Sequence, residues 1–249
     1  MRVRVRERGR AVGGRPVRGC AARTFALLAA TAALVAGTLW LGTVLPGRWY
    51  YLTATLVVVE SMLPFFARFE ARRPQARELA LVATMAALAA ASRVAFALVP
   101  WVKPIMGVIM VAGAAFGAET GFLVGALAAL ISNFFFSQGP WTPWQMMAYG
   151  VGGLLAGLVF RGRPGWCRPV PLAFFGFASV LLVVGPLLDA STLFTTASVL
   201  TWPYVLAVFA AGLPANAILA VATGVTLLLV GRPLLAKLER LRVKYGLLE

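Results

Sequence analysis

The sequence contains no histidine, and only 8 of its 249 residues are aspartate or glutamate. It has two cysteines, Cys20 and Cys167, whose separation matches no common spacing of metal ligands. The usual zinc and di-iron sites need clusters of these residue types and are therefore excluded. GxSxG, HExxH, Walker A and DxxDD-type motifs are also missing. We therefore expect no catalytic residues, no metal and no cofactor, and we do not expect an enzyme.

Charge is scarce as well, because charged residues make up 12% of the chain, about half the share in an ordinary soluble domain. Hydrophobic residues make up 61%, and the mean hydropathy is +0.86. These values exclude a soluble globular enzyme, a disordered chain and a coiled coil. Several apolar runs approach the roughly 20 residues that a spanning helix needs. The sequence predicts an all-α polytopic membrane protein.

The net charge of +15 comes from 23 basic and 8 acidic residues. A strongly basic chain can bind nucleic acid. Here, however, the arginines and lysines lie mostly in short segments between apolar runs, as in loops on the cytoplasmic face of a membrane. We therefore expect the lipid bilayer, and no nucleic acid, as the partner of this charge.

The apolar runs predict eight spanning helices. Their expected ranges are about 24–44, 50–67, 78–98, 105–118, 121–136, 144–160, 170–188 and 203–230. A polar stretch at 189–201 is predicted to connect the last two. The basic residues alternate between connections so that both termini fall on the cytoplasmic side of the cell membrane. The connections near 100, 140 and 195 then open outward.

The basic break at 68–78 divides the chain into parts. These are a basic tail at 1–23, two N-terminal helices with a basic linker at 24–77, a six-helix core at 78–230 and a basic tail at 231–249. The first tail carries eight arginines and fits either a cytoplasmic segment that touches anionic lipid or an extension from a misassigned start codon. We expect a retained first helix rather than a signal peptide, because the run at 24–44 is long enough to span.

Residues 132–150 combine indole, amide and hydroxyl groups near one membrane face, with Pro143 at an expected helix start. Such groups suit a pocket for a planar or amphipathic molecule. The alternative is an aromatic belt at the membrane interface. Lys103 could attract an anionic substrate or could extend to the interface. The candidate substrate-binding residues are Lys103, Asn133, Gln138, Trp141, Thr142, Trp144, Gln145 and Tyr149.

Four further polar residues lie in or beside apolar runs, where they are costly unless they face protein or water. Glu60 and Arg93 fall inside expected helices and could pair with each other. Asp189 and Asn216 could line a site or cap a helix, and capping is the favoured interpretation for Asp189.

Two faces of small residues can let helices approach closely. Ala83, Ala87 and Ala91 are spaced four apart on the third helix and could serve internal packing or the docking of another subunit. Gly121, Gly125 and Ala129 form a similar face, which we expect to be internal.

Residues 78–230 resemble the substrate-binding (S) components of energy-coupling factor (ECF) transporters. The resemblance is carried by RELALVATMAALAAASRVAF at 77–96, the Lys103-Pro104 turn and GAETGFLVGALAALISNFFFSQGPWTPWQMMAYGVGGLLAGLVF at 117–160. Its specific part, GPWTPWQM, is similar to the branch grouped near cobalamin-type transporters. The first two helices fall outside it.

The resemblance implies a membrane subunit that captures a vitamin or related micronutrient from outside. It also implies docking, through Ala83, Ala87 and Ala91, on a transmembrane coupling (T) subunit driven by two cytoplasmic ABC ATPases. A membrane enzyme or assembly factor of lipid or cell-wall metabolism, and a solitary secondary carrier, remain as alternatives. The substrate stays open, with cobalamin, riboflavin and thiamine among the possibilities.

Overall fold

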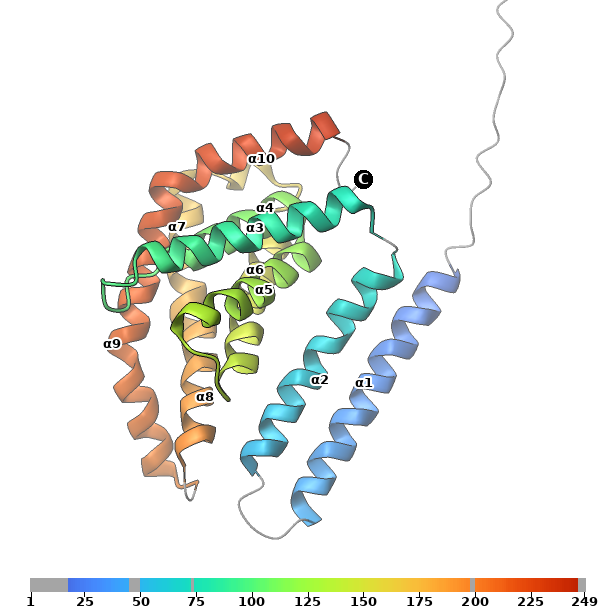
Figure 1. The fold of residues 1–249 in the computed structure, drawn as a ribbon, viewed down its shortest axis with the longest axis vertical. Coiled ribbons are helices and arrows are strands. Elements are labelled where there is room, and N and C mark those ends of the chain that lie inside the picture. The colour runs from blue at the N-terminus through green and yellow to red at the C-terminus, as the bar shows by residue number, and fades with distance from the viewer. Residues whose placement is uncertain (1–17, 45–49, 73, 198–199, 246–249) are drawn as a thin grey trace, which may run out of the picture.

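The computed structural model describes residues 18–44, 50–72, 74–197 and 200–245. These residues are almost entirely helical and form no strand (Figure 1). Most of the predicted N-terminal tail and the last four residues of the chain lie outside the described residues. The α-helices are α1 (Arg18–Val44), α2 (Tyr50–Ala71), α3 (Ala76–Ala95), α4 (Ile105–Phe116), α5 (Ala118–Phe136), α6 (Thr142–Phe160), α7 (Pro169–Ser179), α8 (Gly185–Thr196), α9 (Trp202–Thr226) and α10 (Arg232–Tyr245).

Two helical runs near the C-terminus contain a π-helical turn. The turn η2 (Val180–Val184) joins α7 to α8, and the turn η3 (Leu227–Gly231) joins α9 to α10. Pro186 and Pro233 follow these turns by two residues each. A proline has no N–H for the preceding helical turn, and its ring crowds that turn, which accounts for the local widening.

The prediction of an all-α polytopic membrane protein is confirmed. In the described residues, five helical segments are long and apolar enough to cross a membrane, and two further apolar helices are shorter. The predicted ends at Val44, Phe136 and Phe160 coincide with the ends of α1, α5 and α6. The apolar runs therefore locate the helices well.

The predicted connection at 189–201 is wrong in its first half, because α8 continues through it to Thr196. Thr195 donates its hydroxyl hydrogen bond to the backbone oxygen of Ser191, and Thr196 donates to that of Thr192. These bonds within the helix satisfy the hydroxyl donors. A hydroxyl-rich sequence can therefore extend the helix where polarity alone suggested a connection.

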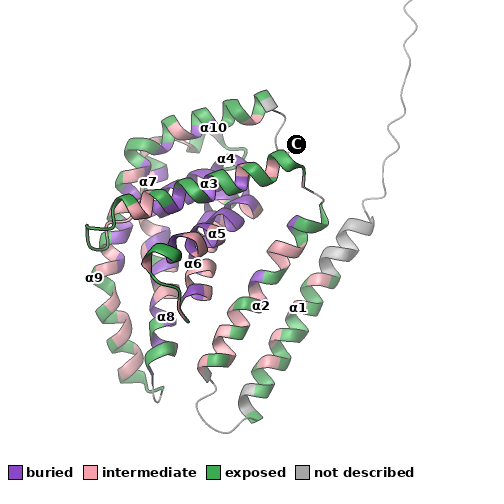
Figure 2. Ribbon diagram, viewed as in Figure 1, coloured by how far each residue is buried: buried purple, intermediate pink, exposed green. Residues whose placement is uncertain are grey.

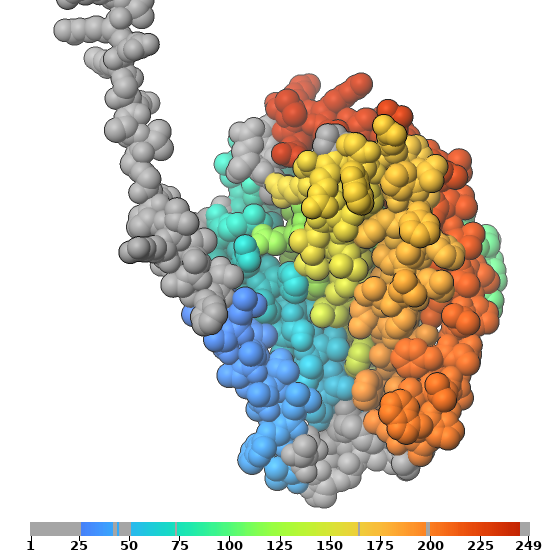
Figure 3. Space-filling view, turned by 180° about the vertical axis from the view of Figure 1, so that it is seen from behind, coloured from blue at the N-terminus to red at the C-terminus, as the bar shows by residue number. Residues whose placement is uncertain are grey.

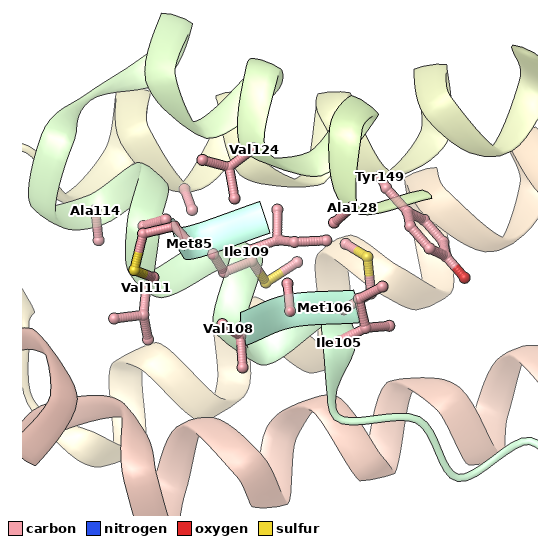
Figure 4. Packing of buried hydrophobic residues seen from close by; sticks show 14 of the residues in the cluster. Met85, Ile105, Met106, Val108, Ile109, Val111, Ala114, Val124, Ala128 and Tyr149 are labelled. Atoms are coloured by element: carbon pink, nitrogen blue, oxygen red, sulfur yellow. The ribbon is translucent and has the colours of Figure 1, made fainter. Parts of the chain in front are cut away.

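Helix α4 forms the centre of the molecule, and all twelve of its residues are buried. At 1.5 Å per residue it is about 18 Å long, which is shorter than the roughly 30 Å hydrocarbon core of a bilayer. Figure 4 shows its side chains against Met85 of α3 and against Val124 and Ala128 of α5. Gly117, with a φ of 103°, turns the chain directly from α4 into α5.

Helices α5 and α6 are packed through glycines. A Cβ built on Gly153 would lie 2.1 Å from the backbone oxygen of Gly121, and a Cβ on Gly125 would lie 2.3 Å from that of Tyr149. Glycine thus allows the two backbones to touch, as in many membrane helix pairs. Gly121, Gly125 and Ala129 are all buried, which confirms the predicted internal face.

Helices α1 and α2 form a hairpin along one flank of the molecule (Figures 1 and 3). Helix α2 contacts α5, α6 and α8, whereas α1 packs mainly on α2. Phe65 of α2 stacks on Phe122 of α5 with ring centroids 3.9 Å apart. Most described side chains of α1 are exposed, in contrast to the buried α4 and α5 (Figure 2).

The two ends of the molecule differ in charge. One end, which we call the basic end, carries the α2–α3 connection, the connection at 161–168 with the short helix η1 (Pro164–Trp166), and α10. The opposite end carries the α5–α6 connection, the end of α8 and the start of α9 (Figure 1). Most of the predicted substrate-binding residues lie at this opposite end.

Candidate functional site

Asn133 is the centre of a hydrogen-bond network at the opposite end of the molecule. Its side chain, only 1% exposed, comes from the last turn of α5. Its amide nitrogen donates to Oε1 of Gln145 at 2.8 Å and to Oγ1 of Thr142 at 3.2 Å. The network therefore joins the end of α5 to the start of α6.

Arg93 of α3 supplies the positive charge of this network. Its Nη1 donates to Oδ1 of Asn133 at 2.8 Å and to Oγ of Ser132 at 2.6 Å. Its guanidinium also lies 4.6 Å from the ring centre of Phe136. The sequence had suggested Glu60 as a partner, but Glu60 instead accepts a hydrogen bond from Thr38 of α1.

The turn that begins α6 is closed by its own side chains. Oγ1 of Thr142 donates to Oε1 of Gln138 at 2.9 Å and accepts from the backbone N–H of Gly139 at 3.2 Å. Nε2 of Gln138 donates to the backbone oxygen of Leu130 on α5. Pro143 occupies the first turn of the helix, where its missing N–H costs nothing. Hydrogen bonds therefore fix the turn both to α5 and to the start of α6.

A cavity of about 300 Å³ lies between the start of α6 and α8. Trp141 and Gln145 line it from the α6 side. From α8 it is lined by Leu188, Ser191, Thr192 and Thr195. Indole, amide and hydroxyl groups thus face one space, which suits a ring-bearing ligand with polar substituents.

Ser191 is the most informative residue of this cavity. Its side chain is 3% exposed, and its Oγ has no hydrogen-bond partner in the described structure. A buried hydroxyl without a partner costs roughly 1–3 kcal/mol. This hydroxyl exposes less than 1 Å² to solvent, so a ligand in the cavity would bond to it, and remove that cost, after a rotation of the Ser191 side chain.

The structure separates the other predicted binding residues from the cavity. Trp144 is buried, stacks on Phe194 of α8 at 5.4 Å and donates from Nε1 to Oγ1 of Thr55 on α2. Tyr149 is buried one turn further along α6, with the guanidinium of Arg93 6.0 Å from its ring centre. Both side chains therefore pack around the network rather than line the cavity.

Lys103 also lies away from the cavity. Its Nζ donates to the backbone oxygens of Phe96 at 2.5 Å, Ala97 at 3.3 Å and Val99 at 3.1 Å, just beyond the end of α3. Burial lowers the pKa of Lys103, and the positive charge of Arg93 lowers it further. In this position Lys103 satisfies backbone carbonyls at the end of a helix, as basic residues commonly do.

Asp189 and Asn216 form a buried pair between α8 and α9. Nδ2 of Asn216 donates to Oδ2 of Asp189 at 2.7 Å. Asp189 lies inside α8, so the favoured interpretation of this residue as a helix cap is wrong. Gly212 makes room for it, because a Cβ there would lie 2.1 Å from Oδ1 of Asp189. The pair therefore joins the two helices.

The alanine face of α3 is split between the core and the surface. Ala86 and Ala90 are buried against the core. Ala83, Ala87 and Ala91 are exposed on the other side of the helix. The three predicted docking alanines thus form a strip on the outside of the molecule.

Sequence reasoning missed Ser191, Thr192 and Thr195, because they fell in a stretch that was expected to connect two helices. Arg93 was noted only as a charge inside an apolar helix, which was the one signal for its role.

Among the described residues, no group of three or more His, Cys, Asp or Glu side chains could hold a metal ion. The side chains that line the cavity between α6 and α8 can instead bind a ligand through hydrogen bonds and aromatic contact.

The family model for the S component of ECF-type riboflavin transporters matches residues 74–240. The match covers more than half of the chain and extends from α3 into α10, so it includes every residue that lines the cavity between α6 and α8. Helices α1 and α2 lie before it. No curated protein and no solved structure matches the chain.

Proposed function

The chain belongs to the family of S components of ECF-type riboflavin transporters, and we propose that it captures a flavin in the cavity between α6 and α8. Membership of this family makes the chain a substrate-binding subunit of a vitamin transporter in the membrane. The identity of the vitamin, the cavity as its site, the partners and the orientation are the proposal.

The observation that carries the proposal is that one cavity is lined by the indole of Trp141, the amide of Gln145 and three hydroxyl residues of α8, among which Ser191 has a buried hydroxyl without a partner. The flat ring system of a flavin can stack on the indole, which is 40% exposed. Its polar ring edge and hydroxylated side chain can bond to the Gln145 amide and the hydroxyls of α8. A flavin therefore uses each kind of group that the cavity presents.

The size of the cavity favours a flavin over a corrinoid. About 300 Å³ is at the lower end of the range for small-molecule sites. A corrinoid, which the resemblance of the GPWTPWQM segment had suggested, is several times larger than a flavin. The cavity would have to open far more widely to accept a corrinoid than to accept a flavin.

Titration of riboflavin fluorescence with the purified protein tests this proposal. We expect saturable quenching at one flavin per chain, and no effect of unlabelled thiamine or cobalamin as competitors. Trp141→Ala should weaken binding roughly two- to twelvefold, which corresponds to the 0.5–1.5 kcal/mol of an aromatic stack. Trp166→Ala, which removes an exposed indole from the basic end, is the matched control. Equal effects of the two variants would contradict the assigned site.

The exposed strip of Ala83, Ala87 and Ala91 is the proposed docking face for a T subunit, whose two ABC ATPases would drive transport. An indole on this strip would hold a docking helix away. Ala87→Trp should therefore abolish flavin uptake by cells and leave flavin binding unchanged. Ala210→Trp, at an exposed alanine of α9, should leave both intact. Uptake that persists in cells that lack any partner ATPase would instead indicate a solitary carrier.

We place the basic end, and with it both termini, on the cytoplasmic side of the cell membrane. The support is the excess of arginine and lysine in the connections at this end. Labelling with a membrane-impermeant maleimide tests the orientation. Cys167 should react only in inside-out vesicles, whereas a Trp202→Cys variant should react at its new thiol only in right-side-out ones. The reverse pattern would place the cavity between α6 and α8 inside the cell.

A further inference from the structure

A second polar cavity, of about 420 Å³, lies at the basic end. Arg72 from the end of α2 and Arg161 from the end of α6 line it. The first turn of α5, with Glu119 and Thr120, forms another wall. The start of a helix is favourable for an anion, because its N–H groups point outward and the helix dipole is positive there.

Positive charge exceeds negative charge around this cavity. Arg68 and Arg72 both pair with Glu119, at 2.5 and 2.7 Å. Arg161 donates to the backbone oxygen of Phe116 at 2.7 Å, and Arg242 of α10 donates to that of Ala115 at 3.5 Å. Two guanidinium groups thus pair with one carboxylate, and two more bond to backbone oxygens at the end of α4. Of these four arginines, Arg72 and Arg161 line the cavity.

The basic residues are close enough to oppose one another's charge. The pKa of Arg161 is lowered first by burial and then by the positive charges of Arg242 and Arg72, while Glu119 acts in the opposite direction. An anion among these groups would relieve their repulsion. Guanidinium groups also match the geometry of phosphate oxygens through paired hydrogen bonds.

An apolar cavity adjoins the polar one. It measures about 360 Å³ and lies between α1 and α2, lined mostly by apolar side chains such as Leu28, Pro64 and Phe65. Its polar limit is formed by Arg68 and Glu119. Because Glu119 lines both cavities, the apolar cavity and the polar cavity meet at this ion-paired side chain.

We propose that these two cavities hold one anionic phospholipid, with its phosphate near Arg72 and Arg161 and an acyl chain between α1 and α2. The arrangement matches the two parts of such a lipid at a membrane interface. Basic pockets between spanning helices are a recurrent form of lipid recognition. The proposal gives the α1–α2 hairpin a role, since α1 supplies one wall of the acyl-chain cavity. It does not depend on the flavin site at the other end.

Native mass spectrometry of the full chain, titrated with phosphatidylglycerol and phosphatidylcholine in detergent, tests the proposal. We expect one phosphatidylglycerol to be retained in preference to phosphatidylcholine. Arg72→Gln and Arg161→Gln should each weaken its binding about fivefold, the effect of one basic residue near an anionic lipid. Arg163→Gln removes an exposed arginine that does not line the cavity and should have little effect. Equal loss in all three variants would overturn the proposal in favour of diffuse charge attraction.

Two further experiments distinguish binding of a phospholipid from binding of a free phosphate ion. Ala32→Trp should fill the apolar cavity and weaken phosphatidylglycerol binding, whereas inorganic phosphate at millimolar concentration should compete poorly. Strong competition by phosphate, with no effect of Ala32→Trp, would overturn the lipid assignment. Arg161→Lys keeps the charge and should retain more binding than Arg161→Gln. An unchanged unfolding temperature of each lipid-free variant shows that the fold is intact. Because this control needs no riboflavin, failure here is distinguishable from failure of the flavin proposal.

Discussion

Arg93 on α3 donates a hydrogen bond from Nη1 to Oδ1 of Asn133 on α5 across 2.8 Å. The amide nitrogen of Asn133 donates a hydrogen bond to Oε1 of Gln145, and Gln145 lines the cavity between α6 and α8. The exposed face of α3 carries the proposed docking alanines. One buried amide thus connects the helix of the proposed docking face to the wall of the proposed binding site.

Replacing Asn133 with leucine should destabilise the protein. The change leaves the Arg93 guanidinium and the Gln145 carbonyl without their shared partner, at a cost of roughly 1–3 kcal/mol in the free energy of unfolding. Thermal unfolding in detergent measures the loss. Ser132→Ala should cost less, because the guanidinium keeps its bond to Asn133. An Asn133→Leu protein as stable as the wild type would show that the network contributes little.

Replacing Ser191 with alanine should have opposite effects on the empty and the loaded protein. The empty protein should be no less stable, because the removed hydroxyl has no partner. Riboflavin affinity should fall roughly three- to tenfold with the loss of one hydrogen bond of about 1 kcal/mol. Ser179→Ala on α7 is the matched control, since this buried serine does not line the cavity and its hydroxyl bonds to Gly176 and Met110. Unchanged affinity in Ser191→Ala would remove Ser191 from the site.

Adding a single methyl group at Gly153 should strain the α5–α6 contact. Its Cβ would lie 2.1 Å from the backbone oxygen of Gly121, so the helices must move apart, at a cost of about 1–3 kcal/mol. Gly37→Ala on α1 meets open space and should be neutral or stabilising. Urea or thermal unfolding of both variants measures the difference. Similar stabilities would contradict the close approach of the two backbones.

Cys167 should react slowly with iodoacetamide in the folded protein. Burial raises the pKa of its thiol, and the negative charge of Glu239 raises it further, so less reactive thiolate is present at a given pH. The raised pKa also means that this thiol's contribution to stability is lost as pH rises through the folded-state pKa. The test measures the alkylation rate of Cys167 from pH 7 to 10 in a Cys20→Ser variant. The pH at which this rate increases should be higher for the folded protein than for the denatured protein. Coincident profiles would contradict the shift.

The sequence was sufficient for the apolar helices because burial in a membrane requires long apolar runs, and these are visible without contacts. It did not predict α10, which lies in the segment described as a basic tail. It failed at 189–196, where side-chain hydroxyls bond to their own helix and allow polar residues to remain helical. Composition cannot distinguish such a segment from a connection. The same failure hid Ser191, Thr192 and Thr195, which line the cavity.

The sequence predicted which segment contains the candidate site, but it did not predict how the side chains of that segment are arranged. Gln138, Thr142, Gln145 and Asn133 do meet in one network, because a short turn joins α5 to α6. The side to which each indole points depends on neighbouring helices, and so Trp141 faces the cavity whereas Trp144 faces Thr55 of α2. The partner of Arg93 also depends on packing, since Ser132 and Asn133 are about forty residues away in sequence.

The most direct test of the account is the identity of the small molecule that accompanies the protein when it is purified in mild detergent from cells grown with vitamins. Mass spectrometry of the denatured sample should find riboflavin or a close flavin at about one per chain, and markedly less in Trp141→Ala than in Trp166→Ala. Added riboflavin should also raise the unfolding temperature of protein purified without it. A stoichiometric vitamin of another class, or a protein that riboflavin neither accompanies nor stabilises, would contradict the proposed flavin site.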